Sequence, residues 1–456
     1  MSATAPSAPA APAAAERPKA AHNVFWLVAE RGLKAVGGLG IGILIARHLG
    51  PENYGRYGAA IGLATLAKEA VMLGFDRMIR RDLAARPQQA GAIIGTSIVL
   101  GLVLALGVAL GLTAVVGKLV DDALTQKLTL IVIWMAFPQA FFACEIWFES
   151  AGWTRPLVWT RNVVWLASLA GRITLVFTHA SVVAFAILAL VEWIVTYAAV
   201  CGLLRRLHRH ELAFSFDFAQ LRAWFSEGRP IILMVVLNST AERLMVVLVH
   251  NLARVDTEAG YLSAALRITD IWWSISTIVA AVFLPRIVAL QRTDPDHCAR
   301  AVQLYANASL FVGVAAAVAV TLTAPFLIPW LFGAAYAPSA IVLVIVFWSG
   351  AAVFPAVARA QFWVSRGQVA LELPCIATVA FVQLGLAVLL IPRFGAIGAA
   401  IAMTSAQWIG FYGVTLVLPR LRAASHAQFA AFRSLLAPLE TARSLASFAR
   451  GMVRKG

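Results

Sequence analysis

The chain has 456 residues, of which 61% are hydrophobic and only 13% carry a charged side chain. A soluble globular domain is about one-quarter charged, so this composition and a mean hydropathy of +0.81 exclude a soluble protein and predict an integral membrane protein. The net charge of +15 is compatible in size with nucleic-acid binding, but the basic residues are scattered between apolar segments, so we predict no nucleic-acid partner.

The chain begins with an Ala/Pro-rich stretch, 1–22, which we predict to be a disordered cytoplasmic tail. Apolar segments long enough to cross a bilayer follow, since about 20 apolar residues span the hydrocarbon core. They predict an all-α polytopic membrane protein with about 12 transmembrane helices. The expected spans are 24–47, 57–76, 91–116, 128–149, 157–178, 181–204, 229–250, 259–284, 301–323, 338–359, 370–391 and 396–418.

The Lys and Arg residues outside these spans are unevenly distributed. The two tails and every second loop hold 25 of them, and the remaining loops hold six. Cytoplasmic loops are enriched in Lys and Arg, so both termini are expected in the cytoplasm, which requires an even number of spans. The aromatic segment 214–228 is too short to cross the bilayer, and we predict that it lies at the membrane interface just before the seventh helix. Apolar residues form a stripe along one helical face of 425–452, with arginines interspersed, and this stripe predicts an amphipathic helix that lies on the inner leaflet.

Charged side chains within the predicted spans are the candidate site. Each one at bilayer depth costs at least ~2.5–3.5 kcal/mol on insertion scales, so such residues normally face a cavity or a partner. The first span holds two basic residues beside one acidic residue, and the second and eighth spans each add a basic residue; buried cations that are not fully neutralised require an anion. Arg and Lys suit phosphate. We therefore predict a central cavity that binds a phosphate-bearing substrate through Arg31, Lys34, Lys68, Arg243 and Arg267.

The acidic residues of the spans allow two interpretations. Glu30 lies four residues before Lys34 and Asp270 three after Arg267, so ion pairing on one helix face is expected. Coupling of transport to protons or sodium is the alternative. Both remain open for Glu30, Glu192, Glu242 and Asp270. Arg172 and Glu149 lie near span ends, where long side chains reach the interface.

The sequence offers no catalytic or cofactor motif. The cysteines (Cys144, Cys201, Cys298 and Cys375) are far apart, the histidines lack metal-site spacing, and no GxxxxGK[ST] phosphate loop is present. We predict no cofactor, no metal and no ATP hydrolysis. The outward loops are short and hold no carboxylate pair, which argues against an enzyme acting on sugars.

Four segments resemble the polysaccharide-type (Wzx-like) flippases of the multidrug/oligosaccharidyl-lipid/polysaccharide exporter superfamily. They are "IARHLGPENYGRYGAA" (45–60), "MLGFDRMIRRDLA" (72–84), "FLPRI" (283–287) and "RFGAIGAAIAMTSAQ" (393–407). The resemblance covers roughly 23–418. The resemblance also implies an internal repeat, and the sequence offers weak support for one, since "GRYGAA" at 55–60 and "GYLSAA" at 260–265 agree at three of six positions.

The resemblance implies two pseudo-symmetric six-helix bundles around a central cavity and transport by alternating access. The domains would be a bundle at 23–204, a cytoplasmic interfacial linker at 205–228, a second bundle at 229–418 and a basic amphipathic cytoplasmic tail at 419–456. Related lipid II flippases carry cavity arginines in helices one, two and eight. Arg31 and Arg267 lie in the first and eighth helices and so correspond to two of these arginines. The second helix has Lys68 in place of the third arginine. Twelve helices instead of fourteen favours the oligosaccharide branch.

The implied function is flipping of polyprenyl-diphosphate-linked oligosaccharide across the bacterial inner membrane for cell-surface polysaccharide biosynthesis. The implied partners are that lipid-linked substrate, the lipid bilayer, and a polysaccharide polymerase with its chain-length machinery. Three alternatives remain: an ion-coupled multidrug/cation antiporter of the same superfamily, a membrane glycosyltransferase or polymerase, and a non-transporting scaffold.

Overall fold

The computed structural model describes residues 20–120, 122–208, 214–293 and 295–434, and every regular element in these ranges is helical. The first half contains α1 (Ala20–Met72), α2 (Phe75–Ala85), η1 (Pro87–Gln89), α3 (Ala90–Leu119), α4 (Ala123–Val132), η2 (Ile133–Met135), α5 (Ala136–Gln139), α6 (Phe142–Ser150), α7 (Thr154–Phe177) and α8 (Val182–His208). The predicted tail 1–22 lies almost wholly outside the described residues.

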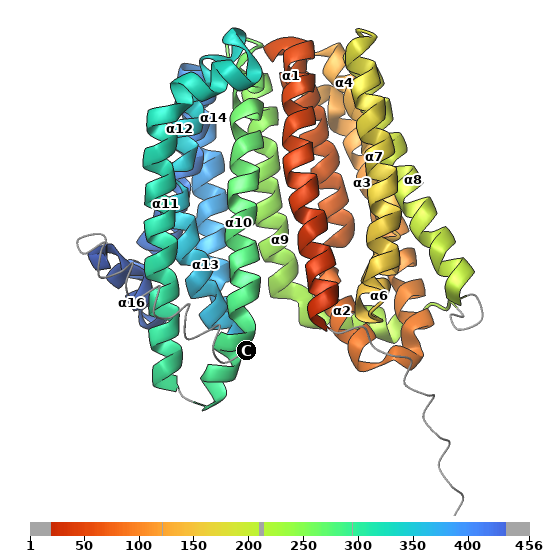
Figure 1. Ribbon diagram of the computed structural model, residues 1–456, viewed down its shortest axis with the longest axis vertical. Helices are drawn as coiled ribbons and strands as arrows, with labels where there is room; N and C mark the ends of the chain where they lie inside the picture. Colours follow the sequence, from red (N-terminus) through yellow and green to blue (C-terminus); the bar gives the residue numbers. More distant parts are fainter. Residues whose placement is uncertain (1–19, 121, 209–213, 294, 435–456) are drawn as a thin grey trace, which may run out of the picture.

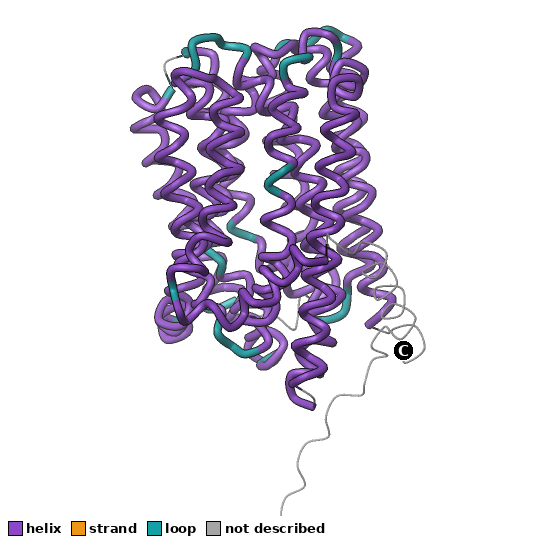
Figure 2. The backbone as a smooth tube through the Cα atoms, turned by 90° about the vertical axis from the view of Figure 1, so that its left-hand side faces the viewer, coloured by secondary structure: helices purple, strands orange, loops and turns teal. Residues whose placement is uncertain are grey.

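The second half is built in the same way from long helices. It contains α9 (Phe218–Leu252), α10 (Glu258–Thr293), α11 (Pro295–Phe332), η3 (Ala334–Tyr336), α12 (Ser339–Phe347), α13 (Gly350–Ser365), η4 (Val369–Glu372), α14 (Leu373–Trp408), the π-helical η5 (Ile409–Gly413), α15 (Val414–Val417) and α16 (Pro419–Ser434). The helices run mostly along one axis, and most loops lie at the two ends (Figure 2).

Two of the helices are bent hairpins that each supply two membrane passages. In α1 the bend is at Gly50, whose φ of 70° is left-handed, followed by Pro51, which cannot donate a backbone hydrogen bond. In α14 the bend is at Gly395, with φ of 55°. A Cβ on Gly410 would lie 2.9 Å from the carbonyl oxygen of Cys375, so the second leg of α14 returns alongside the first.

The prediction of twelve spans is confirmed. Eight helical segments of the described chain are long and apolar enough to cross a membrane, and two of them contain the bends at Gly50 and Gly395. The fourth predicted span is built from α4, η2, α5 and α6, and the tenth from α12 and α13. The fifth and eighth correspond to α7 and α10, which are long helices outside those eight segments.

The helices form two groups that meet mainly through α1. Within the first half α1 packs on α4 and α7, and α7 packs on α8. Within the second half α9 packs on α14, α10 on α12, and α11 on α13. Across the two halves α1 packs on both α9 and α10. Figure 1 shows α1 and α10 close together at the upper end and well apart at the lower end.

Small residues make the contact between α1 and α10 possible. A Cβ on Gly55 would lie 2.6 Å from the backbone nitrogen of Gly260, and one on Gly58 would lie 2.4 Å from the Ser263 hydroxyl. Gly55 and Gly58 are the first and fourth positions of "GRYGAA", and Gly260 and Ser263 are the same positions of "GYLSAA". Equivalent positions therefore face each other, as a two-fold relation between the halves requires. We call this contact the glycine seam.

Hydrogen bonds reinforce the same end of the molecule. The Tyr336 hydroxyl donates to the carbonyl oxygen of Ala46 at 2.9 Å, and the Arg47 side chain donates to that of Leu331 at 2.7 Å. Burial raises the pKa of Tyr336, so the phenol remains a donor. Asp122 caps α4 by accepting from the Thr125 amide at 2.7 Å. Burial alone would raise the Asp122 pKa, but these hydrogen bonds and the charge of Arg56 lower it.

The opposite end is organised by the start of α9. Trp224 is fully buried against Phe75 of α2, and its indole donates to the Asp82 carboxylate at 2.8 Å. Gln220 donates to the same carboxylate at 2.7 Å. The first turns of α9 therefore pack on the first half of the chain, whereas the rest of α9 packs on α14 in the second half.

The stripe predicted to lie on a membrane surface is partly covered by protein. Phe429 and Phe432 of α16 both contact Tyr412, with ring centroids 5.4 Å and 5.5 Å away. Gln428 is buried and donates to the carbonyl oxygen of Phe411 at 3.2 Å. In this part of the stripe the expected lipid contact is replaced by packing on the bundle. The remainder of the stripe, from 435 onward, lies outside the described residues.

The glycine seam generates a prediction about stability. In Gly260→Ala the new Cβ would lie 1.9 Å from the Pro51 carbonyl oxygen, so α1 and α10 must separate. We expect a loss of about 1–3 kcal/mol, the usual effect of overpacking. Gly107→Ala on α3 is the matched control, because nothing lies within 4 Å of its Cβ. Thermal unfolding in detergent should show a lower Tm for Gly260→Ala alone, and equal Tm values would contradict the seam.

Candidate functional site

Two adjoining cavities lie near the middle of the helices. The first, which we call the inter-half cavity, measures about 150 Å³ and is walled by α1, α9, α10 and α14. The second, the first-half cavity, measures about 300 Å³ and is walled mainly by α1, α7 and α8, with Met135 of η2 and Arg267 of α10. Both are lined by Tyr54, Tyr57, Ile61 and Arg267, so the second leg of α1 and one arginine from α10 separate the two spaces.

Arg267 reaches across from the second half into the first. Its guanidinium donates to the carbonyl oxygen of Gly38 at 2.7 Å. A Cβ on Gly42 would lie 2.6 Å from Arg267 Nε, so a side chain there would displace the arginine. The glycine pair of "GGLGIG" thus accommodates this charged side chain. Small residues four apart are otherwise typical of close helix packing.

The first-half cavity is strongly basic. Four basic side chains and one acidic side chain line it: Lys34, Lys68, Arg172, Arg267 and Glu192. Arg172 pairs with Glu192, which also accepts from Ser168 at 2.7 Å. Lys68 lies 4.0 Å from the ring centroid of Trp193, a cation–π contact that leaves the ammonium without a carboxylate partner in the described contacts. The cavity therefore keeps a positive surplus that an anion can neutralise.

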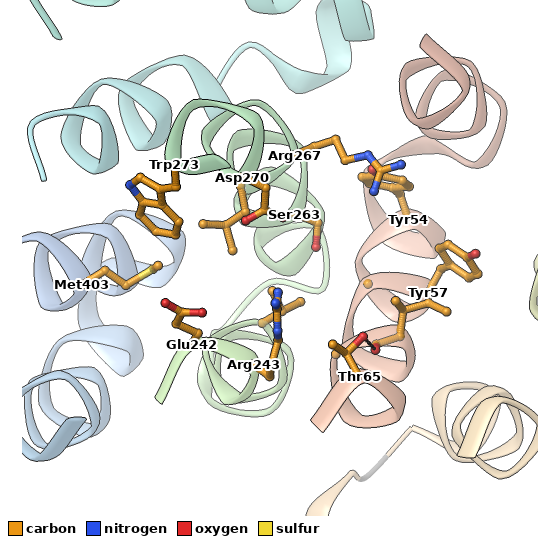
Figure 3. A pocket seen from close by; sticks show the side chains of 15 residues that line it. Tyr54, Tyr57, Thr65, Glu242, Arg243, Ser263, Arg267, Asp270, Trp273 and Met403 are labelled. Carbon is orange, nitrogen blue, oxygen red and sulfur yellow. Dashed lines mark hydrogen bonds between the residues drawn. The ribbon is translucent and has the colours of Figure 1, made fainter. Parts of the chain in front are cut away.

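The inter-half cavity is balanced in charge. Arg243, Arg267, Glu242 and Asp270 all line it, so its basic and acidic side chains are equal in number. In Figure 3, Glu242 and Arg243 project from α9 toward Asp270 on α10, while aromatic side chains of α1 and α10 close the sides. Arg243 also donates to Glu69 on α1 at 3.3 Å, with about a third of each side chain exposed. A space lined by charges of both signs, hydroxyls and rings suits a polar neutral group.

Glu30 belongs to an ion-pair chain at the lower end of the first-half cavity. It is 3% exposed, pairs with Lys34 at 2.7 Å and with Arg161 at 3.1 Å, and Arg161 also lies 3.5 Å from Glu145. The geometry gives Glu30 and Glu192 ion partners, whereas Glu242 and Asp270 face the inter-half cavity.

The structure brings four of the five predicted basic residues to the two cavities. Lys34 and Lys68 line the first-half cavity, Arg243 lines the inter-half cavity, and Arg267 lines both. Arg31 lies on α1 three residues before Lys34, and its side chain is outside the described residues. The expectation for Arg172 is wrong, because it turns into the first-half cavity instead of reaching the interface. Its pairing with Glu192 on the neighbouring helix could not be found from spacing within one helix.

Comparisons with known proteins show which proteins share this architecture. A family model described as "Polysaccharide biosynthesis protein" matches residues 44–341. An inward-facing multidrug resistance MATE family transporter of the MOP superfamily superposes with a TM-score of 0.69 at 16% identity, over 89% of this chain and 99% of that chain. The lipid II flippase MurJ, in an inward closed conformation, gives 0.68 at 13% identity, over 91% and 92%. The search of curated proteins returns no match.

A third solved structure is similar over comparable lengths. It is a MOP superfamily transporter from Pyrococcus furiosus described by a "reverse polarity of binding pocket", with a TM-score of 0.61 at 14% identity over 88% of this chain and 94% of that chain. At these identities the three likenesses show a shared fold. They confirm the expected pair of pseudo-symmetric bundles and the resemblance to the polysaccharide-type members of the superfamily.

The position of Arg267 generates a prediction about anion binding. Gly42→Ala should displace the guanidinium without disturbing the helices, because the clashing atom belongs to a flexible side chain. Inorganic pyrophosphate should raise the Tm of the wild type, since a ligand stabilises the state that binds it. Losing one charge-assisted contact should weaken its binding about tenfold or more. Gly40→Ala, on the same helix with nothing within 4 Å, should bind as the wild type does; equal weakening in both variants would contradict the role of Arg267.

Proposed function

This chain belongs to the family described as "Polysaccharide biosynthesis protein", and from that premise we propose that it flips polyprenyl-diphosphate-linked oligosaccharide between bilayer leaflets by alternating access. The observation that carries the proposal is the basic surplus of the first-half cavity, where Lys34 and Arg172 have carboxylate partners but Lys68 and Arg267 have none among the described contacts. Phosphate is the anion that Arg and Lys recognise best. The predicted fifth member of the set, Arg31, would add to the same site.

The two cavities suit the two parts of the substrate head. The diphosphate would bind where the two cavities meet, contacting Lys68 and Arg267 on the first-half side and Arg243 on the inter-half side, and the sugars would extend into the inter-half cavity. There Tyr54, Tyr57 and Trp273 offer rings, and Glu242 and Asp270 offer acceptors for sugar hydroxyls. Arg267 lines both spaces and would contact the junction between diphosphate and sugar.

Alternating access would use the glycine seam as its pivot. The seam and the Tyr336–Ala46 hydrogen bond close one end, and α1 and α10 diverge toward the other (Figure 1). We propose that the diverging end is cytoplasmic, because it carries the start of α1 and the basic α2. The chain would then sit in the bacterial inner membrane with both termini in the cytoplasm, and with the bundles at 23–204 and 229–418 joined by the linker 205–228.

Electrical work could drive the transfer. A membrane potential of 100 mV is worth about 2.3 kcal/mol per charge, so a diphosphate with about two negative charges would gain ~4–5 kcal/mol on leaving a negative cytoplasm. Glu242 and Asp270 line the inter-half cavity and would be the groups for proton or sodium coupling, if it occurs. We assign the chain no enzymatic activity, and the polysaccharide polymerase remains an expected partner.

The runner-up function is an ion-coupled multidrug/cation antiporter. The observation that favours it is the inter-half cavity, where two carboxylates and three aromatic side chains would suit an organic cation. The basic first-half cavity beside it opposes that function, since its surplus charge repels a cation. Efflux of a fluorescent lipophilic cation from proteoliposomes under a proton or sodium gradient would separate the two functions.

The proposed function is tested by lipid flipping in proteoliposomes. A fluorescent polyprenyl diphosphate with a short sugar is placed in one leaflet, and a membrane-impermeant quencher reports its transfer. Wild type should move the label, and the double variant Lys68→Ala/Arg267→Ala should reduce the rate at least about 100-fold, as two charged phosphate contacts are removed.

The matched control is Lys118→Ala, which removes an exposed basic residue at the end of α3, away from the cavities. It should flip lipid at the wild-type rate. If the double variant keeps full activity, the basic cavity is not the route of the head group, and efflux of the lipophilic cation by the wild type would favour the antiporter instead.

A further inference from the structure

A third cavity lies where the two halves of the chain meet, on the side that faces the membrane. It measures about 230 Å³ and is walled by α1, α3 and α9. Leu66, Val108, Leu112, Val235 and Val236 supply most of its lining. We call it the lateral groove. Val236 is 40% exposed and Leu110, on the neighbouring surface of α3, is 61% exposed, so the groove lies among side chains that face the lipid.

The lining determines what the lateral groove can hold. Nearly all of it is hydrocarbon, and only one charged side chain, Glu69, contributes to it. An apolar space of this size holds water poorly because water finds too few hydrogen-bond partners there. A hydrocarbon chain that fills it gains dispersion contacts on every side. The same apolar lining that favours a hydrocarbon chain excludes phosphate and sugar.

The lateral groove adjoins the inter-half cavity through one ion pair. Glu69 lines the groove, Arg243 lines the inter-half cavity, and the two side chains meet at 3.3 Å. Thr65 of the cavity and Leu66 of the groove are consecutive residues on α1. The pair therefore stands where a ligand with a charged head in the cavities and an apolar chain in the groove would pass between α1 and α9.

Resting on the proposed function, we propose that the lateral groove seats the first isoprene units of the polyprenyl chain and that Glu69–Arg243 separates this chain from the head group. With the substrate absent, Glu69 neutralises Arg243. When the diphosphate enters, it competes for Arg243 and repels Glu69, so the pair opens and the linkage between head and chain passes through. The ion pair thus couples binding of the head to admission of the chain.

Photo-crosslinking tests this inference. The probe is undecaprenyl diphosphate with a diazirine on the isoprene unit next to the diphosphate. In the purified full-length protein it should label peptides of α3 and α9 that contain Leu112 and Val235. Ala70→Phe, which fills the groove from α1, should reduce this labelling about tenfold or more, since an isoprene unit loses several buried carbon contacts.

Two further variants control the result. Ala114→Phe places the same ring on the exposed surface of α3 outside the groove and should label as wild type does. Glu69→Gln removes the competitor for Arg243, so it should bind pyrophosphate several-fold more tightly and increase groove labelling. A merely structural ion pair would give the opposite result, with weaker binding in Glu69→Gln.

The outcomes separate this inference from the proposed function. If pyrophosphate still raises the Tm but the probe labels no groove peptide, the groove does not hold the chain and the flippase proposal stands. If a diazirine phospholipid labels the groove equally well and undecaprenyl diphosphate does not compete, the groove holds bilayer lipid and the inference is overturned. If pyrophosphate does not bind the wild type at all, the proposed head site fails, and this inference fails with it.

Discussion

The close contact between α1 and α10 is the constraint on which the rest of the structure depends. Gly55 and Gly260 bring two backbones together where any side chain would collide, and the bend at Gly50 places both legs of α1 beside that contact. In a bilayer, helix association relies on such packing because lipid is as apolar as the side chains. The glycine seam also determines where Tyr54, Tyr57 and Arg267 lie along the helix axes, and these three residues line both main cavities.

Part of this arrangement was predictable from the sequence because membrane insertion leaves a strong local signal. Apolar length fixed the twelve spans, and charges such as Lys34, Lys68 and Arg243 stood out against that background. The weak agreement between "GRYGAA" and "GYLSAA" acquires meaning in three dimensions, since its equivalent positions are in contact. Whether those residues bind a substrate is a separate matter that the cavities support and only experiment decides.

Other features depend on contacts between distant helices and leave no such signal. Arg172 pairs with Glu192 on α8, and Gly42 makes room for Arg267 on α10. Arg359 is the last residue of the predicted tenth span, where a long side chain can reach the interface, yet it is 1% exposed inside the bundle. Spacing within one helix cannot reveal a partner on another helix, so sequence analysis identified which charges are buried but not which are neutralised.

The two halves differ in how their buried basic side chains are matched, despite their similar folds. In the second half Arg359 donates to both oxygens of Glu372 at 3.1 Å and 2.7 Å and also to Gln428 and the Phe411 carbonyl, so its charge is fully matched. Such a buried network connects α13, η4, η5 and α16 and leaves no unmatched charge there for a ligand. In the first-half cavity Lys68 contacts the ring of Trp193, and Arg267, which reaches in from α10, donates to a backbone carbonyl, so neither has a carboxylate partner among the described contacts. The pseudo-symmetric scaffold thus presents basic side chains without carboxylate partners on one side of its axis, and under the proposed function this asymmetry would give the anionic head group a defined place to bind.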